Sequence, residues 1–216
     1  MTVNVSVVTP TYNRRAFIPK AIEYFKAQTW PQANLEWIVL DDGTDKVGDL
    51  FTGLPNVRYI ALPEGQKLSI GAKRNRLHSL ANGDIIVCMD DDDQYPETRV
   101  AHAVTSLLQN PKCRIAGSSI MPLYFQDRKE TWLSGPFGPN HGTFNTLAFW
   151  RSYTKDHQCD ETVTHGEEFS FTGGWTQPMV QLNTADTVLM ICHDSNTFDK
   201  RCLFRNPAPV MRRVVC

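Results

Sequence analysis

The chain has 216 residues, of which 41% are hydrophobic and 21% charged, and its formal net charge is -1. A chain of this length buries a substantial core as one α/β domain or as two smaller ones. The balanced charge gives no general attraction to nucleic acid or to an anionic membrane, so we expect neither as a partner. No apolar run approaches the length of a membrane span, and no signal-peptide layout opens the sequence. The six cysteines form no CxxC pair, which favours reduced thiols in a cytoplasmic protein over a disulfide framework.

Strand and helix patterns alternate along the first half of the chain. Short apolar runs rich in β-branched residues predict strands at 3–8, 35–40, 57–62 and 85–89. The spacing of apolar residues predicts helices at about 18–29, 70–80 and 97–108. Because a strand–helix–strand series forms a parallel, doubly wound sheet with right-handed crossovers, the expected fold class is α/β.

The pattern changes after Asn110-Pro111. Segments 114–125 and 142–150 read as strands, with a loop rich in glycine and proline between them. A short polar helix is expected near 166–171 and a last strand at 187–191. This second half predicts a smaller, mixed region that holds a second substrate. The final VMRRVVC completes no element, which is consistent with the first domain of a longer protein.

An acidic run, Asp90 to Asp93, follows the fourth expected strand in the stretch IIVCMDDDDQYP. Neighbouring carboxylates repel one another and lose hydration when buried, so a solvated loop is one interpretation. In open α/β sheets, however, ligands bind beyond the carboxyl ends of the strands, where this run falls. Carboxylate oxygens suit the hard cations Mg²⁺ and Mn²⁺. Since neighbouring strand residues face opposite ways, we expect Asp90 and Asp92 to converge on such a cation while Asp91 points elsewhere.

Polar residues also follow the first and second strands, in the segments TPTYNRR and LDDGT. A nucleotide at this edge of the sheet would meet residues of both segments, namely Thr9, Pro10, Tyr12, Arg14, Asp41 and Asp42. The first loop has no glycine, which excludes the G-x-G-x-x-G site of dinucleotide-binding proteins, and no Walker loop occurs. Without a glycine-rich cradle the diphosphate needs another source of positive charge, and a metal held by aspartates provides one.

Three segments, VSVVTPTYNR, EWIVLDDGT and GAKRNRLHSLANGDIIVCMDDDD, occur in an order that resembles the nucleotide half of family-2 glycosyltransferases with the GT-A fold. The resemblance runs from residue 5 to 96 and is weaker beyond. It implies one GT-A domain with a nucleotide-sugar-binding half, 1–110, and an acceptor-binding half, 111–216. Within the family the chain is similar to the amino-terminal domain of glycosyltransferases encoded by chlorella viruses, which implies the cytoplasm of a host cell.

The resemblance assigns roles to residues around the nucleotide. The turn at 9–13 packs the nucleoside. Asp41 accepts a hydrogen bond from the uracil N3–H, while Asp42 braces the turn. Arg74, with Lys73 beside it, lies near the ribose or the diphosphate.

The resemblance also places the metal. The span from Asp90 to Asp92 matches the D-x-D motif that holds Mn²⁺ or Mg²⁺ on the diphosphate, and Asp90 and Asp91 are expected to contact the nucleotide sugar. The fourth aspartate leaves the register of the motif ambiguous by one residue. His193, in LMICHDSNTF, is expected to complete the metal ligands, since several GT-A enzymes use a late histidine; a structural histidine is the alternative.

The segment THGEEFSFTGGW resembles the acidic pair before a tryptophan that supplies the family's general base. Here the pair is Glu167 and Glu168, and we choose Glu168 as the base. The alternative is that both glutamates open a solvated helical turn. Trp132, Trp150 and Trp175 lie in or beside the second-half loops, where their rings would stack on an acceptor sugar or pack in the core.

The expected function is that of a metal-dependent, inverting hexosyltransferase. It would move a sugar from a UDP-sugar, UDP-glucose first and UDP-rhamnose second, to a hydroxyl of a glycan or glycoprotein. One rival is a nucleotidyltransferase, which normally needs a glycine-rich first loop. The other is a non-catalytic module that binds metal or carbohydrate. This rival does not explain why Asp41-Asp42 and the Arg74-Asn75 pair match motifs of the glycosyltransferase family.

Overall fold

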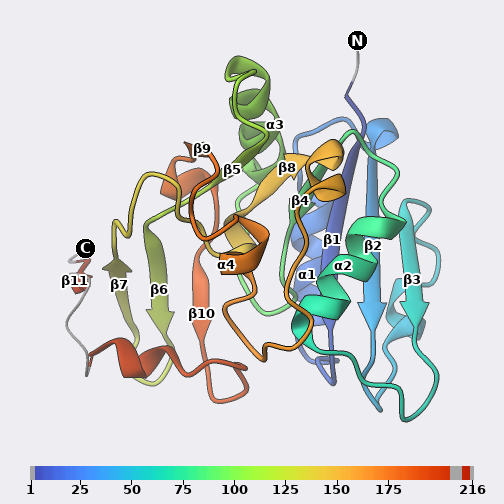
Figure 1. Ribbon diagram of the computed structural model, residues 1–216. Helices are drawn as coiled ribbons and strands as arrows, with labels where there is room; N and C mark the ends of the chain where they lie inside the picture. The colour runs from blue at the N-terminus through green and yellow to red at the C-terminus, as the bar shows by residue number, and fades with distance from the viewer. Residues whose placement is uncertain (1–2, 205–210, 215–216) are drawn as a thin grey trace.

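A parallel sheet forms the first half of the molecule in the computed structural model, which describes residues 3–204 and 211–214. Its strands are β1 (Val5–Thr11), β2 (Leu35–Asp41), β3 (Val57–Ala61) and β4 (Ile85–Cys88), in the order β3-β2-β1-β4 (Figure 1). All four are parallel, as predicted. β1 continues past the expected end at residue 8 through Pro10, which is tolerated because β4 pairs with β1 only as far as Val8.

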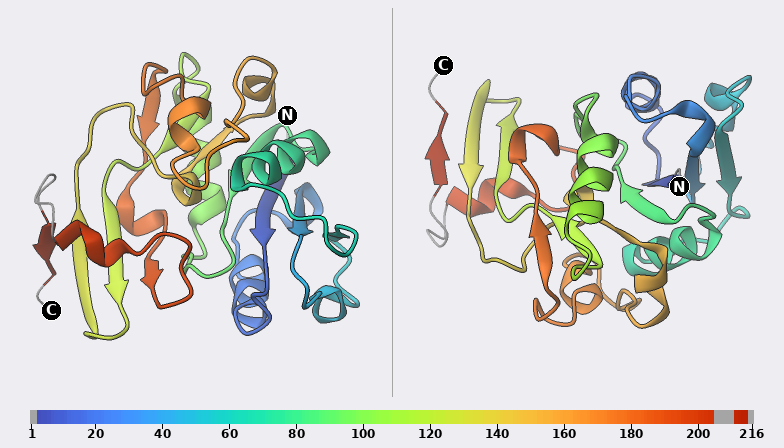
Figure 2. Two further views of the ribbon diagram at one scale, coloured as in Figure 1. Left: turned by 60° about the horizontal axis from the view of Figure 1, so that its bottom comes forward. Right: turned by 90° about the horizontal axis from the view of Figure 1, so that it is seen from above.

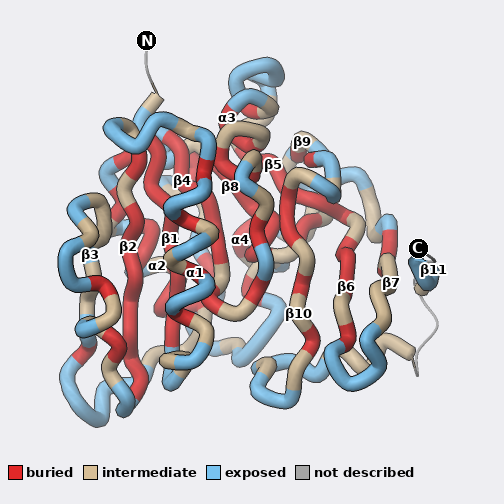
Figure 3. Tube along the Cα trace, turned by 180° about the vertical axis from the view of Figure 1, so that it is seen from behind, coloured by how far each residue is buried: buried red, intermediate tan, exposed pale blue. Residues whose placement is uncertain are grey.

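Helices cover both faces of this sheet. α1 (Ile18–Lys26) and α3 (Arg99–Gln109) lie on the face seen in front in Figure 3, and α2 (Ile70–Leu80) lies on the other face together with α4 (Glu168–Phe171). Two buried apolar clusters, one under each pair of helices, fill the space between helices and strands. The predicted doubly wound α/β architecture is therefore confirmed.

Strands from the second half extend the same sheet. β8 (Ala148–Trp150) pairs with β4, β5 (Ile115–Gly117) with β8, and β9 (Met179–Gln181) with β5. Both β8 pairings are antiparallel, whereas the other described pairings in this seven-stranded sheet are parallel. The sheet is thus mostly parallel, and it joins the two halves of the chain.

A second, smaller sheet lies at the opposite end of the molecule from β3 (Figure 2). It has the order β10-β6-β7-β11 and consists of β10 (Met190–Cys192), β6 (Met121–Phe125), β7 (Glu130–Ser134) and β11 (Met211–Arg213). The prediction of one strand over 142–150 was wrong in part, because 144–146 form a 3₁₀ turn before β8. The last predicted strand, 187–191, corresponds to β10, which begins only at Met190. The sequence patterns did not predict β7, β9 or β11.

None of the described helices is long and apolar enough to cross a lipid bilayer. The longest, α2 and α3, have 11 residues each, whereas a helical span needs about 20 apolar residues.

Candidate functional site

A cavity of about 440 Å³ lies at the carboxyl ends of β1 and β4, a size typical of small-molecule sites. Its wall also includes residues of α2, of the segment around α4 and of β10. Most sequence-predicted residues line it, namely Pro10, Tyr12, Arg14, Lys73, Arg74, the aspartates at 90–93, Glu167 and Glu168. The fold therefore brings the aspartate run and the glutamate pair to one cavity.

The four aspartates have four different environments. Asp90 accepts two hydrogen bonds from the Arg74 guanidinium, at 2.8 and 3.1 Å. Asp91 is buried, and its Oδ2 has no hydrogen-bond partner among the described residues. Burial, together with the charge of Asp92, raises the pKa of the Asp91 carboxyl well above its usual value. Asp91 is therefore the member of the run with one enclosed oxygen, Oδ2, that has no hydrogen-bond donor among the described residues.

Asp92 lies among cations at the edge of the cavity. Its Oδ2 is 3.5 Å from the Arg14 guanidinium and 3.3 Å from Nε2 of His193. Burial would raise the pKa of Asp92, but the hydrogen bond from His193 and the charges of Arg14 and Lys200 outweigh it and lower that pKa. Asp92 thus carries its negative charge more readily than an ordinary aspartate.

Asp93 has an internal role. Its carboxylate accepts hydrogen bonds from the Asn145 side chain at 2.5 Å and from the backbone N–H of Ile191 at 3.0 Å. These bonds attach the turn after β4 to β10, in the second sheet. Burial and the neighbouring Asp92 charge raise the pKa of Asp93 to about 7.

Arg74 connects the two acidic groups. Its side chain is 5% exposed, and besides Asp90 it donates to Glu167 Oε1 from Nε at 3.1 Å. The guanidinium also lies 4.4 Å from the centre of the Phe144 ring. Although burial alone would lower it, the charges of Asp90 and Glu167 raise the pKa of Arg74 well above its ordinary value. The positive charge of Arg74 is therefore already balanced within the protein.

Glu167 and Glu168 differ because only one of them has a counter-ion. Glu167 is buried against Arg74. Glu168 begins α4 and lines the cavity without a cationic partner. Burial, and next the charge of Glu167, raise the pKa of Glu168 to about 7. A carboxyl poised near neutral pH in a cavity is what general-base chemistry requires.

Helix α2 is fastened to the segment that leads to these glutamates. A Cβ on Gly71 would meet the backbone oxygen of Asp160 at 2.0 Å, so only glycine allows this approach. One turn later, the Asn75 side chain donates to the Cys159 oxygen at 3.0 Å and accepts from the Cys159 N–H at 2.9 Å. These contacts fix the distance between Arg74 and Glu167.

Three residues predicted to contact the nucleotide, Thr9, Asp41 and Asp42, do not line the cavity. Thr9 is 1% exposed, and its hydroxyl donates to the Met89 oxygen and accepts from the Trp37 indole. Asp41 is fully buried and accepts from the N–H groups of Gly43 and Val47 and from the Tyr59 hydroxyl. Asp41, rather than Asp42, is thus the residue that braces the turn.

Asp42 points toward α2. Its carboxylate pairs with Lys73, which lines the cavity, and accepts from the Leu68 N–H at 3.0 Å. Burial lowers the pKa of Lys73, and the Asp42 charge partly offsets this. Asp42 is thus held against α2, and the predicted nucleotide contacts of both aspartates stay predictions.

His193 lies behind Asp92 instead of on the cavity wall. Its ring stacks on Phe17 at 4.7 Å between centroids, and Nδ1 accepts from the Ser195 N–H at 3.2 Å. Nε2 is 3.0 Å from the Asn196 amide as well as 3.3 Å from Asp92. Both ring nitrogens thus have protein partners, and the histidine orients Asp92.

The register of the metal ligands stays a prediction, but Asp90 and Asp91 differ in how far protein groups already occupy their oxygens. The strand ends at Cys88 and residues 91 and 92 lie in a turn, so strand alternation does not apply to them. Both Asp90 oxygens bind Arg74, whereas Asp91 has an enclosed oxygen with no donor, the position that a cation would fill. No three acidic, histidine or cysteine side chains among the described residues form a ready cage. This agrees with Mg²⁺-type sites, in which one or two carboxylates share the ion with substrate phosphates.

Sequence patterns missed three polar residues of the site. Lys200 lines the cavity and acts electrostatically on Asp92, and Asn196 donates to Asp92 at 3.3 Å. Asn145 holds Asp93. Asn196 lies in a loop, and Asn145 and Lys200 lie in short 3₁₀ turns. None belongs to a motif, so only the three-dimensional proximity identifies them.

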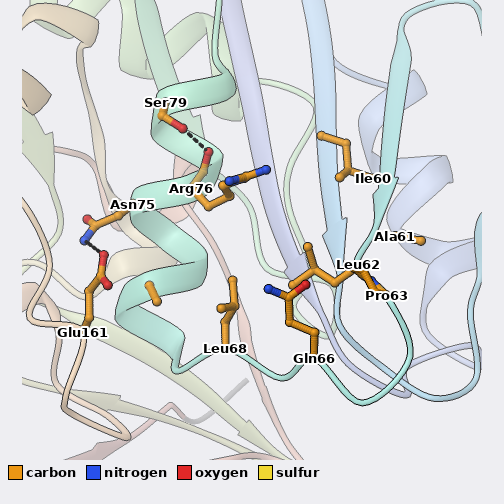
Figure 4. A pocket seen from close by; sticks show the side chains of 11 residues that line it. Ile60, Ala61, Leu62, Pro63, Gln66, Leu68, Asn75, Arg76, Ser79 and Glu161 are labelled. Carbon is orange, nitrogen blue, oxygen red and sulfur yellow. Dashed lines mark hydrogen bonds between the residues drawn. The ribbon is translucent and has the colours of Figure 1, made fainter.

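A second hollow, of about 610 Å³, lies on the outer side of α2 (Figure 4). Ile60, Leu62 and Leu68 form its apolar part, and Arg76 and Glu161 are its ionisable residues. Because Glu161 is already bonded to Asn75 and no pair of carboxylates meets there, this hollow lacks the chemistry of the first cavity.

Comparison with curated proteins gives related enzymes. The chain is 30% identical over 99 residues to glycosyltransferase GlyG of Streptococcus pneumoniae, covering 44% of this chain and 32% of the relative. It is 29% identical over 139 residues to the undecaprenyl-phosphate 4-deoxy-4-formamido-L-arabinose transferase of Aeromonas hydrophila, covering 59% and 39%. The chain therefore spans between about a third and two fifths of the length of these relatives.

Solved structures share the fold. S. aureus TarS 1-349 in complex with UDP-GlcNAc matches with a TM-score of 0.71 and 17% identity, over 90% of this chain and 60% of that one. The mannosyltransferase PcManGT from Pyrobaculum calidifontis, in complex with GDP-Man and Mn²⁺, matches with a TM-score of 0.69 and 16% identity, over 91% and 59%. These are glycosyltransferases with the GT-A type of fold. The profile of the family described as Glycosyl transferase family 2 covers residues 6–167, and the chain belongs to that family.

Proposed function

We propose that the chain transfers a hexosyl group from a UDP-sugar to a hydroxyl of a glycan or glycoprotein, with inversion and with the help of Mn²⁺ or Mg²⁺. The proposal is carried by two features of one cavity. One is an aspartate turn in which Asp91 has an enclosed oxygen with no donor among the described residues, and the other is Glu168, whose pKa is about 7. UDP-glucose is the first candidate donor and UDP-rhamnose the second, both from the family resemblance. A host cytoplasm is proposed as the place of action on the resemblance to chlorella-virus enzymes, which is drawn from the sequence alone.

On the donor side, the chain offers positive charge and an aromatic ring. Arg14, Lys73 and Lys200 line the cavity near the aspartates, where a diphosphate would lie. The Tyr12 ring is 36% exposed and has the Lys67 ammonium 4.1 Å from its centre, which suits a stacked base. A divalent cation held by Asp91 and Asp92 would supply Lewis-acid stabilisation of the leaving diphosphate. Of the Asp41-Asp42 pair, Asp42 is the better candidate for the base contact, since its partner Lys73 lines the cavity.

On the acceptor side, Glu168 takes the proton of the attacking hydroxyl. Glu167 is unsuited to this task because Arg74 occupies it. The acceptor oxygen forms a bond to the anomeric carbon while the bond to the diphosphate breaks, and the electrons of that bond stay on UDP. Attack from the face opposite the leaving group inverts the anomeric centre.

The test is a comparison of UDP, GDP and ADP as stabilising ligands, with and without MnCl₂. We expect UDP to raise the melting temperature most, and to do so only with the metal, since a ligand that binds the folded state alone stabilises it. Hydrolysis of a panel of nucleotide sugars then identifies the donor. Equal stabilisation by GDP would refute the UDP assignment, and release of pyrophosphate from UTP and a sugar phosphate would indicate a nucleotidyltransferase instead.

A further inference from the structure

The turn that carries the four aspartates is closed from the inside by a tyrosine hydroxyl. Tyr95 is 3% exposed, and its Oη accepts a hydrogen bond from the backbone N–H of Asp90 at 2.7 Å. This bond joins the two ends of the segment 90–95. The same Oη lies 3.5 Å from the backbone oxygen of Asn145, whose side chain holds Asp93. One hydroxyl therefore contacts both the start of the turn and the residue that fixes its end.

The backbone on either side of Tyr95 is itself held in place. The N–H and the carbonyl of Gln94 both bond to the backbone of Leu189, at 3.0 and 2.8 Å. The carbonyl of Pro96 accepts from the buried Gln28 side chain at 3.0 Å. A proline also restricts the residue before it to extended conformations. The tyrosine is thus a fixed point to which the beginning of the turn is attached.

Packing alone does not account for the hydroxyl of Tyr95. The ring belongs to one of the two buried apolar clusters, where a phenylalanine would fill nearly the same space. A hydroxyl removed from water costs free energy unless it forms a hydrogen bond, and the N–H of Asp90 supplies one. The turn needs such bonds, because its neighbouring carboxylates repel one another and would spread a loose segment. The hydroxyl therefore acts on the shape of the turn.

A second buried polar side chain lies near the turn but acts on a different place. Arg99 is fully buried, and its guanidinium donates from Nη2 to three backbone oxygens, those of Cys88, Thr146 and Leu147. These bonds hold the end of β4, before the aspartates begin. Tyr95 is thus the better candidate for control of the aspartates themselves.

We propose that Tyr95 is a positioning residue that makes the aspartate turn rigid and thereby sets its preference for a small divalent cation, Mg²⁺ or Mn²⁺, over Ca²⁺. This inference rests on the proposed function. Mg²⁺ demands near-ideal octahedral geometry with oxygens at about 2.0–2.1 Å, whereas Ca²⁺ accepts roughly six to eight oxygens at about 2.3–2.6 Å in flexible arrangements. A turn fixed at both ends keeps the spacing of its carboxylates. A turn released at Asp90 adapts more easily to the larger ion.

The experiment compares Tyr95→Phe with Tyr153→Phe in the whole chain. Tyr153 is the matched control, because it is 1% exposed and its hydroxyl donates to the Phe171 oxygen at 3.0 Å, away from the aspartates. Each variant keeps its ring and loses one buried hydroxyl, so both should fold and melt a few degrees below the wild type. Calorimetry measures UDP affinity with MgCl₂ and with CaCl₂. Amide hydrogen exchange over 89–95 is followed by mass spectrometry without metal.

We expect the wild type to bind UDP more tightly with Mg²⁺ than with Ca²⁺. Tyr95→Phe should weaken the Mg²⁺-dependent binding about tenfold, the lower end of the range for groups behind metal ligands, and the Ca²⁺-dependent binding by no more than about twofold. Its segment 89–95 should also exchange amide hydrogens faster. Tyr153→Phe should change neither the ratio of the two affinities nor the exchange of this segment.

The inference is overturned if Tyr95→Phe keeps the wild-type ratio of affinities or the wild-type exchange over 89–95. It is also overturned if Tyr153→Phe lowers the ratio as much, since the effect would then follow from lost stability alone. A wild type that binds UDP equally well with both cations would contradict it too. A wild type that binds UDP with neither cation refutes the proposed function, and this inference with it.

Discussion

The cavity has two acidic walls that are built alike and yet differ in chemistry. In each wall one carboxylate, Asp90 or Glu167, is bonded to Arg74. In each wall the next residue, Asp91 or Glu168, has a pKa raised first by burial and then by a neighbouring carboxylate. Arg74 thus pairs with one carboxylate on each side, whereas neither Asp91 nor Glu168 forms an ion pair with a described residue.

The surroundings decide what each unpaired carboxylate can do. The aspartate wall has Arg14 and Lys200 nearby, and Asp92 keeps a lowered pKa there. A cation and a diphosphate can share such a mixture of charges. In the glutamate wall, Glu168 forms no ion pair with a described residue and has a raised pKa, so it can exchange a proton with a neutral partner. Burial and neighbours, more than residue type, assign the roles.

The strongest test of this division is Glu168→Gln. The amide keeps the shape of the side chain but accepts no proton at neutral pH, so transfer should fall by roughly 10²–10⁴, the usual contribution of a general base. Donor affinity should stay within about twofold, because we place no donor contact on Glu168. Initial rates at saturating donor, with UDP binding alongside, check both. Near-normal turnover would refute the assignment, and Glu167→Gln, expected to affect the fold more than the proton transfer, is the control.

Replacing Arg74 by methionine tests the link between the walls. It leaves Asp90 and Glu167 without their partner, and breaking a buried ion pair from one side costs about 3–5 kcal/mol of the free energy of unfolding. Urea denaturation measures this. Adding Asp90→Asn and Glu167→Gln to the same protein should recover much of the loss. A single variant as stable as the wild type would show that Arg74 does not join the walls.

The roles of the aspartates in metal binding are tested by comparing three variants, Asp91→Asn, Asp92→Asn and Asp93→Asn. The first two should weaken Mn²⁺-dependent UDP binding about 10- to 100-fold, the range for disturbing metal ligands and their neighbours. Asp93→Asn should have a smaller effect, because Asp93 bonds to Asn145 and Ile191. Calorimetric titrations with and without MnCl₂ measure the three. Should Asp93 prove the most sensitive, the metal register is shifted by one residue.

The smallest expected effect is that of pH. Glu168 must be ionised to accept a proton, and its pKa is about 7. The transfer rate should therefore rise with pH through 7, and at one pH unit below the pKa it should be about tenfold below its high-pH plateau. The raised pKa of Glu168 also adds to the free energy of unfolding at low pH. This contribution is lost as the pH rises from the usual pKa of glutamate, about 4.3, through 7. Both dependences should disappear in Glu168→Gln. A flat pH–rate profile in the wild type would contradict the role of Glu168.

The sequence was most informative where structure is local. The helix predicted at 70–80 matches α2, because helical periodicity and the Ser69 cap are encoded within a dozen residues. Four parallel strands were recognised from their apolar runs. In the second half, the segments predicted as strands over 114–125 and 142–150 contain β5, β6 and β8, whereas β9, with three residues, is too short to show a period. The 3₁₀ turn at 144–146 inside an apolar run was read as strand for the same reason.

The site followed the same rule. Motifs identified the aspartate run and the glutamate pair, but not the contact between Arg74 and Glu167, which are 93 positions apart. The partners that distinguish Asp41 from Asp42 are Tyr59, in a third strand, and Lys73, in a helix. Neighbouring identical residues offer no sequence signal that distinguishes them.

The antiparallel strand β8 affects how a fragment of the chain behaves on expression and when the chain can fold during synthesis. β8 separates β4 from β5 in the sheet, so the side of β4 away from β1 is closed by β8 together with its flanking residues Leu147 and Arg151. A fragment ending near residue 110 would expose Ile85, Ile86 and Val87, all fully buried here, as an unpaired apolar edge that invites aggregation. Pairing strands so distant in sequence also slows folding. We therefore expect the nucleotide-binding half to be insoluble when expressed alone, and the ribosome to release a foldable chain only after β9 has been synthesised.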